Sequence, residues 1–458
     1  MNSIIILSAL GLATMFAGIY ANKKILLPMV LLGLLAVIVV NTIDWDTNKH
    51  YYNDMLSFDN YSIVFTNLIL VVTFLIFLLS GNYFKDHREH LEDNYAIILF
   101  TVVGAVLMVS FSNLVMLFIG IETLSISLYI LAGSKKNSLA SNEASLKYFL
   151  MGSFATGFLL FGIVLLYGAC GTFNLSGITS YVVTNNAGLP AIFYVGILLI
   201  MIGLAFKVSI VPFHFWTADV YDGSPTIITA FMATVVKIAG FAAFFRLFFT
   251  CFVSVSDHFI PVLSILAVCT MFLGNITAVY QKNFKRMLAY SSIAHAGYML
   301  LAVIAMKNQS FMAILLYTAA YSFATITAFT VLIMMKSANG NDAIENFNGL
   351  SKKSPFVAFA ITLSMLSLAG IPITAGFFAK YYIFSTVISE GHTWLVVIAI
   401  LNSAIGVFYY FRIIIAVYFK QGEANFISPD FAYKAVLIIT AIATLLLGIL
   451  PGLVIDRM

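Results

Sequence analysis

Apolar runs of about twenty residues follow one another along the whole chain and are separated by short polar segments. At 1.5 Å per residue, a helix of this length crosses the roughly 30 Å hydrocarbon core of a bilayer. The pattern predicts an all-α polytopic membrane protein with about fourteen transmembrane helices. The predicted spans are 3–20, 25–43, 62–80, 95–111, 113–132, 144–168, 190–210, 226–246, 259–279, 287–306, 310–335, 355–387, 394–419 and 434–455.

Composition points to the same class. Of the 458 residues, 62% are hydrophobic and 9% are charged, which is too apolar for a soluble core of this size. The first run has no basic segment before it and no small-residue cleavage site, so we expect a retained helix and not a signal peptide. The polar loops are too short for a nucleotide-binding or iron–sulfur domain, and Cys170, Cys251 and Cys269 lack cluster spacing. We therefore expect no redox cofactor in this chain.

The distribution of Lys and Arg predicts the orientation. Loops after odd-numbered spans hold fourteen basic residues, whereas the other side, termini included, holds four. Basic residues accumulate in cytoplasmic loops, so both termini should lie outside the cytoplasm. Five basic residues remain within spans, and one of them, Arg412, lies near a span end where it would act as an anchor.

Two spans contain or precede a proline that should break the helix. The seventh runs on to Pro212, and the twelfth, 355–387, contains Pro372. The twelfth would measure about 50 Å as one straight helix, which is too long for a single crossing. We therefore predict a break within each of these two spans.

Each predicted break falls in the fourth helix of a block of five. Because five is odd, the second block enters from the opposite face, as in the inverted repeats of many transporters, whose ion sites lie at broken helices. The predicted units are helices one to three (1–94), a first repeat (95–250), an inverted second repeat (251–420) and a last helix (421–458). The alternative is that two common transmembrane prolines match by chance.

Besides Arg412, five charged residues lie within predicted spans: Glu122, Lys147, Lys207, Lys237 and Lys380. A charge near the bilayer centre costs about 2.5–3.5 kcal/mol, so such residues usually mark an ion path. Burial favours the neutral form of a lysine and a nearby carboxylate favours the charged form, so moving the partner charge makes a lysine release or take a proton. Glu122 and Lys207 are the predicted switch pair; the alternative is a static salt bridge between two helices.

The other lysines suggest a relay. Lys237 lies midway along its span and is the predicted central relay, while Lys380 would exchange protons on the other side. Lys147 is near the start of its span and could instead extend to the interface. Of the seven histidines, His214 and His295 are the two inside predicted spans, with the seventh span read on through Trp216, and histidine suits a proton shuttle. His295 is favoured as a relay, whereas His214 could equally orient the broken helix.

The segment Gly223-Ser224-Pro225 predicts the start of the eighth span, with Ser224 as the cap. Asp219 and Asp222 beside it are a candidate proton entrance, although acidic residues at helix starts usually only complement the helix dipole.

Four longer motifs carry a family resemblance. They are Phe118-Ile-Gly-Ile-Glu-Thr-Leu124, the segment from Phe206 to Tyr221, Lys285-Arg-Met-Leu-Ala-Tyr-Ser-Ser-Ile-Ala-His295 and Leu366-Ser-Leu-Ala-Gly-Ile-Pro372. They resemble the antiporter-like proton-channel subunits of respiratory complex I, and the chain is most similar to the subunit N branch, the bacterial counterpart of mitochondrial subunit 2.

This resemblance implies a proton-translocating subunit in the membrane arm of a bacterial NADH-quinone oxidoreductase, embedded in the inner membrane, where the charge distribution places both termini in the periplasm. It implies a coupling role for Glu122 and Lys207 and a lysine at the position of Lys147. NAD, FMN, iron–sulfur clusters and quinone would belong to partner subunits. The expected partners are other membrane-arm subunits, the lipid bilayer and protons, and no nucleic acid.

Two other functions are compatible with these sequence features. A subunit of a multi-subunit Na⁺/H⁺ antiporter would share the fold, and neighbouring genes would distinguish it. A scaffold that assembles the arm without conducting is the other alternative, but a scaffold would gain stability by replacing buried lysines with leucine.

Overall fold

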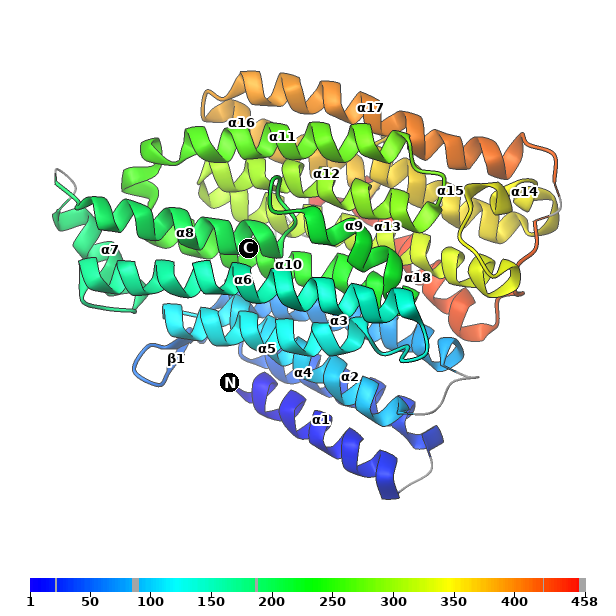
Figure 1. Ribbon diagram of the computed structural model, residues 1–458, viewed down its shortest axis with the longest axis horizontal. Helices are drawn as coiled ribbons and strands as arrows, with labels where there is room; N and C mark the ends of the chain where they lie inside the picture. Colours follow the sequence, from blue (N-terminus) through cyan, green and yellow to red (C-terminus); the bar gives the residue numbers. More distant parts are fainter. Residues whose placement is uncertain (21–22, 85–89, 186–187, 423, 453–458) are drawn as a thin grey trace.

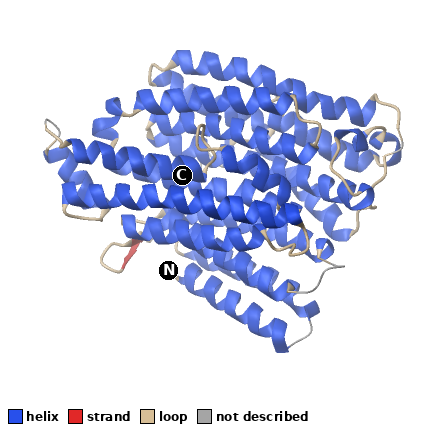
Figure 2. Cartoon of the chain, in the orientation of Figure 1, coloured by secondary structure: helices blue, strands red, loops and turns tan. Residues whose placement is uncertain are grey.

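The chain is almost entirely helical, and its helices lie side by side from α1 at one edge to α17 at the other (Figures 1 and 2). The computed structural model describes the chain except residues 21–22, 85–89, 186–187, 423 and 453–458. Lys85, Arg88 and Arg457, which enter the predicted orientation, lie outside the described residues, as does the end of the predicted span 434–455.

The helices and strands have the following bounds: α1 (Asn2–Tyr20), η1 (Lys23–Ile25), α2 (Leu26–Ile43), β1 (Lys49–Tyr51), β2 (Leu56–Phe58), α3 (Asn60–Tyr83), α4 (Leu91–Ser110), α5 (Leu114–Ala132), α6 (Leu139–Cys170), α7 (Leu175–Thr184), α8 (Ala191–Lys207), α9 (Phe215–Gly223), α10 (Thr226–Cys251), η2 (Val253–His258), α11 (Ile260–Val279), α12 (Phe284–Ala305), α13 (Asn308–Asn339), η3 (Ile344–Phe347), α14 (Leu350–Lys353), α15 (Pro355–Ala369), α16 (Ala375–Ser389), α17 (Thr393–Tyr418) and α18 (Phe431–Ile449).

The predicted fold class is confirmed. In the described part of the chain, twelve helices are long and apolar enough to cross a membrane, and they correspond to every predicted span except the seventh and the twelfth. Those two are each divided into a pair of shorter helices. The chain is therefore an all-α polytopic membrane protein.

Both predicted breaks are present. The seventh span consists of α8, a non-helical link at 208–214 that contains Pro212, and α9. The twelfth consists of α15, a link at 370–374 that contains Pro372, and α16. In each case proline removes a backbone donor where the helix would continue, so the lysines nearby lie beside helix ends and not within an unbroken helix.

The two blocks of five helices pack alike. α4 packs on α5 as α11 packs on α12, and α10 closes the first block against α4 as α17 closes the second against α11. The paired helices approach so closely that a Cβ on Gly104 would lie 2.8 Å from the carbonyl oxygen of Gly120, and one on Gly274 would lie 2.5 Å from the amide of Ala294. The division at 95–250 and 251–420 stays a prediction, which these matched contacts support.

The centre of the bundle is formed by α10, which is buried along its whole apolar window, and by α12 and α13, which are nearly so. α10 packs against α3, α4, α12 and α13. By contrast, α1 and α2 bury little of their surface within this chain. Polar side chains on α10, α12 and α13 are therefore surrounded by protein.

Some local predictions were wrong. α6 begins at Leu139, five residues before the predicted start, because Ser138 accepts a hydrogen bond from the amide of Ser141 and caps it. Ser224 does not cap α10; the first amide of that helix, on Thr226, donates instead to the hydroxyl of Tyr83 at 3.1 Å. The short helix α7 and the β1–β2 hairpin lie in segments whose hydropathy predicts loops.

Candidate functional site

Four lysines are buried among apolar helices, each exposing at most 7% of its surface: Lys207, Lys237, Lys285 and Lys380. They belong to α8, α10, α12 and α16. Within the described part of the chain, their ammonium groups donate to hydroxyl or carbonyl oxygens and not to a carboxylate. Three of these lysines were predicted from the sequence; the fourth, Lys285, was counted there as a loop residue.

Lys207 is the last residue of α8, directly before the break. Its ammonium donates to the hydroxyl of Ser125 on α5 at 2.7 Å and lies 3.5 Å from the hydroxyl of Tyr148 on α6. A cavity of about 10 Å³ adjoins these groups and is lined by Lys207, Ser125 and Tyr129 among others. That space matches about one water molecule, which needs roughly 10–15 Å³.

Glu122 does not form an ion pair with Lys207 among the described residues. Ser125, one helical turn along α5, holds the lysine instead. Glu122 is half-exposed on a stripe of α5 that also carries the exposed side chains of Ile119 and Ile126. The two members of the predicted switch pair are therefore linked through one turn of helix, not through direct contact.

Lys237 lies near the middle of α10. Its ammonium donates to the carbonyl oxygen of Ser292 on α12 and lies 5.9 Å from the ring centroid of Tyr321 on α13. Val208, the residue after Lys207, packs so closely on α10 that a Cβ at Gly240 would lie 2.5 Å from it. This contact brings the break of the seventh span against α10, although no hydrogen bond within the described residues joins the two lysines.

His295 lies one turn beyond Ser292 on α12. Its Nδ1 is 2.8 Å from the hydroxyl of Tyr317 and its Nε2 is 3.0 Å from the hydroxyl of Tyr410, which also shares a hydrogen bond with Ser291. A tyrosine hydroxyl can donate and accept, so both tautomers of the neutral imidazole are satisfied here. The neutral histidine can therefore carry its single N–H proton on either ring nitrogen without losing a hydrogen-bond partner.

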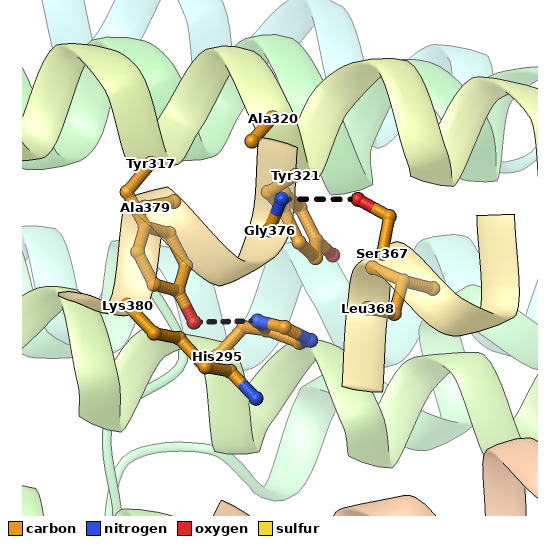
Figure 3. Close-up of a pocket in the computed structure, with 9 residues that line it drawn as sticks. All are labelled: His295, Tyr317, Ala320, Tyr321, Ser367, Leu368, Gly376, Ala379 and Lys380. Atoms are coloured by element: carbon orange, nitrogen blue, oxygen red, sulfur yellow. Dashed lines mark hydrogen bonds between the residues drawn. The ribbon is translucent and has the colours of Figure 1, made fainter. Parts of the chain in front are cut away.

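Lys380 lies near the second break. Its ammonium donates to the carbonyl oxygen of Ala369 and to the hydroxyl of Ser403, both at 2.8 Å. Ala369 is the last residue of α15, so the cation lies at the negative end of a half-helix dipole. A cavity of about 10 Å³ lies between Lys380 and His295, with Tyr317 in its wall (Figure 3). The structure thus brings Lys237, His295 and Lys380 together in the second block.

Two predicted site residues lie apart from the buried lysines and His295. His214 precedes α9, is buried, and its Nδ1 has no hydrogen-bond partner among the described residues. Lys147 is half-exposed on α6 and forms ion pairs with Glu143 at 2.7 Å and Asp219 at 2.9 Å. Asp219 also accepts a hydrogen bond from Arg286 at 3.1 Å. Lys147 has the surroundings of an interfacial residue.

The sequence did not single out the hydroxyl groups that hold these cations and the histidine. Ser125, Tyr148, Tyr317, Tyr410 and Ser403 are spread over α5, α6, α13 and α17. Hydroxyl residues in membrane helices commonly bond to their own backbone, so their presence alone carries little signal. Arg412, predicted as an anchor, donates to the carbonyl oxygens of Val279 and Gln281 at the end of α11.

Comparison with known proteins identifies the family to which this chain is similar. Residues 111–406 match the family described as NADH:quinone oxidoreductase/Mrp antiporter, TM. The chain is 42% identical to NADH-quinone oxidoreductase subunit N of Cytophaga hutchinsonii, over 100% of this chain and 99% of that protein. The chain belongs to the NADH-quinone oxidoreductase subunit N family. It is also 41% identical to subunit N of Flavobacterium psychrophilum, over 99% of each chain.

Solved structures agree with the family. A chain of respiratory complex I from Thermus thermophilus with bound aureothin superposes with a TM-score of 0.85 at 33% identity, over 99% of this chain and 98% of that one. A chain of the Mrp complex from Dietzia superposes with a TM-score of 0.84 at 20% identity, over 99% and 94%, which shows a shared fold alone. The family resemblance of the sequence motifs is therefore confirmed.

Proposed function

We propose that this chain translocates protons as a membrane-arm subunit of a bacterial NADH-quinone oxidoreductase. Full-length identity to subunit N supports membership of that complex. The observation that carries the proton-translocating role is the row of buried lysines whose ammonium groups, among the described residues, donate only to neutral oxygens. NAD, FMN, iron–sulfur clusters and quinone belong to partner subunits in this proposal.

The chemistry of the row suits reversible proton loss. A lysine held by a carboxylate would leave that carboxylate uncompensated on losing its proton, whereas a lysine held by hydroxyls and carbonyls leaves only neutral groups. Lysine can lose its proton when buried, which arginine cannot. Lys207, Lys237 and Lys380 are therefore the proposed relay cations, and His295 with its two tyrosines carries protons between Lys237 and Lys380.

Glu122 is the proposed input for coupling. A half-exposed carboxylate on an apolar stripe at membrane depth is costly in lipid, so a neighbouring subunit of the arm has to cover it. A change of charge at Glu122 alters the stability of the ammonium form of Lys207, which Ser125 holds one turn of α5 from Glu122, because an opposite charge nearby favours the charged form. Lys147 and His214 take supporting places beside the cytoplasmic interface and the first break.

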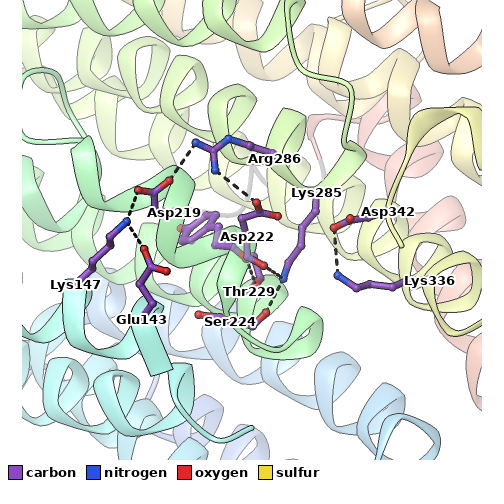
Figure 4. A network of polar contacts seen from close by, with 11 residues as sticks. Glu143, Lys147, Asp219, Asp222, Ser224, Thr229, Lys285, Arg286, Lys336 and Asp342 are labelled. Atoms are coloured by element: carbon purple, nitrogen blue, oxygen red, sulfur yellow. Dashed lines mark hydrogen bonds and ion pairs between the residues drawn. The ribbon is translucent and has the colours of Figure 1, made fainter. Parts of the chain in front are cut away.

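The proposed location is the bacterial inner membrane, crossed many times, with both termini in the periplasm. The excess of basic residues in the loops after odd-numbered spans supports this orientation. The described loops of this set lie at one end of the bundle (Figure 1), and Lys147, Arg286 and Lys336 line one cleft there (Figure 4).

Substitution of Lys237 distinguishes a proton-relay role from a structural role as a fixed positive charge. Lys237→Arg should lose nearly as much proton pumping as Lys237→Ala, because guanidinium keeps its proton at any accessible pH. The measurement is NADH-driven pumping in membrane vesicles at matched content of assembled complex. Lys353→Arg, at an exposed lysine of α14, is the control and should pump normally. A fully active Lys237→Arg complex refutes the relay role.

A further inference from the structure

A charged cleft opens where α6, α9, α12 and α13 approach the end of the bundle that carries the basic loops (Figure 4). Its volume is about 360 Å³. Acidic and basic side chains alternate around it: Glu143, Lys147, Asp219, Asp222, Arg286, Lys336 and Asp342. Arg286 joins Asp219 at 3.1 Å and Asp222 at 3.5 Å, and most of these groups are half-exposed. A cleft of this size and polarity holds many water molecules.

Lys285 lies behind this cleft. It is the second residue of α12 and exposes 1% of its surface. Its ammonium donates to the carbonyl oxygens of Asp222 at 2.8 Å and Ser224 at 2.5 Å. Asp222 thus lines the cleft with its carboxylate and holds Lys285 with its backbone, so a single residue separates the buried ammonium from the charged wall.

The same face of α12 leads from Lys285 to the central lysine. Ser292 follows Lys285 by seven residues and His295 by ten, so all three share one helix face, and Ser292 lies about 10 Å along the axis. The carbonyl oxygen of Ser292 accepts the hydrogen bond from Lys237. Lys285 and Lys237 are therefore held at the two ends of a two-turn stretch of α12.

Polar groups occupy the space between Lys285 and Lys237. The hydroxyl of Ser224, beside Lys285, is buried and has no hydrogen-bond partner among the described residues. The hydroxyl of Ser292 lies close to those of Tyr221 on α9 and Tyr321 on α13, without a hydrogen bond of good geometry to either. Buried hydroxyls of this kind are usually satisfied by ordered water.

We propose that the charged cleft is the aqueous mouth of the proton path and that Lys285 is a relay residue between the cleft and Lys237. This proposal rests on the proposed function. In each transfer the N–H bond of the Lys285 ammonium breaks and the proton passes to water or hydroxyl on the Lys237 side. From there the proton reaches the neutral amine of Lys237, and the neutral Lys285 amine takes a new proton from hydronium in the cleft, which the aqueous phase supplies, so charge and protons balance. The alternative is a structural role, in which Lys285 acts as a pin: its hydrogen bonds hold the end of α9 in place and it conducts no protons.

Arginine distinguishes the relay from the pin, since guanidinium can still donate to both carbonyls but does not release its proton. We expect Lys285→Arg to pump at least tenfold more slowly than wild type in vesicles at matched content of assembled complex. Lys282→Arg, three residues earlier at an exposed lysine, is the matched control and should pump normally. Wild-type pumping by Lys285→Arg overturns the relay.

Lys237→Ala is measured in parallel. If Lys237→Ala abolishes pumping and Lys285→Arg does not, the relay role of Lys285 fails and the proposed function stands. If neither variant lowers pumping, both fail.

A second measurement probes the mouth without altering Lys285. With the three native cysteines replaced by serine, Ala140→Cys places a thiol in the lining of the cleft, and Asn137→Cys places one on the exposed loop before it. A membrane-impermeant, positively charged thiol reagent added to vesicles with the cytoplasmic face outward should block pumping in the Ala140→Cys complex and spare the Asn137→Cys complex. Equal pumping in both treated complexes overturns the proposal.

Discussion

Replacing Gly370 by alanine should displace the ammonium of Lys380. Gly370 has φ +84° and ψ 40°, and a Cβ there would lie 2.8 Å from Cδ and 3.1 Å from Nζ of Lys380. The left-handed backbone costs a non-glycine residue about 1–2 kcal/mol. Overpacking against the lysine adds about 1–3 kcal/mol unless the side chain moves. Moving it lengthens the hydrogen bonds to Ala369 and Ser403, so the lysine leaves its proposed place in the relay.

Gly340→Ala is a matched control for this substitution. Gly340 also has a left-handed backbone, with φ +74°, but a Cβ there meets no atom within 4 Å. The Gly340→Ala substitution therefore carries only the backbone cost of about 1–2 kcal/mol. Both variants should lower the thermal stability of the assembled complex, and Gly370→Ala should lower it more.

Proton pumping should differ between the Gly340→Ala and Gly370→Ala variants. At matched complex content, Gly340→Ala should pump at the wild-type rate, and Gly370→Ala should pump severalfold more slowly with little change in the affinity for NADH. Equal pumping by the two variants would show that the position of the Lys380 ammonium does not matter for translocation.

Other substitutions test the rest of the row. Lys207→Ala and Glu122→Ala should each sharply lower pumping and coupled NADH oxidation in complexes whose assembly is checked on native gels, and near wild-type pumping in either would contradict the switch. Lys147→Arg should keep at least half of the pumping rate, because this half-exposed residue pairs with two carboxylates that guanidinium can also bind; a loss as deep as that of a relay variant would contradict its interfacial place. Tyr410→Phe should lower the free energy of unfolding by about 1–3 kcal/mol, because it leaves Nε2 of His295 without a hydrogen-bond partner. It should also slow proton pumping in vesicles, and unchanged pumping would exclude this tyrosine from the path.

The features that the sequence predicted are those that a bilayer dictates directly. Uninterrupted apolar runs have to be helices in lipid, a proline has to interrupt its hydrogen bonds, and a charge within a span has to be protected from lipid. The spans, the two breaks and three of the four buried lysines were therefore predictable from composition and position alone.

Contacts between helices were not predictable in the same way. Helices of this chain are apolar on all sides, so hydropathy does not reveal which face meets which neighbour. Lys285 follows a polar loop, and its burial depends on how α9 and α12 meet. Glu122 and Ser125 are one turn apart, yet only packing determines that the serine faces Lys207 and the carboxylate faces outward.

The burial of the apolar part of α10 isolates Lys237 from changes in the surrounding lipid. Helices respond to a thinner or thicker bilayer by tilting, and that force acts where lipid touches protein. α1 and α2 are largely uncovered within this chain and bear no buried lysine, whereas the apolar window of α10 is fully enclosed. Tilting of the outer helices can accommodate different acyl-chain lengths while the contact between Lys237 and Ser292 keeps the same geometry.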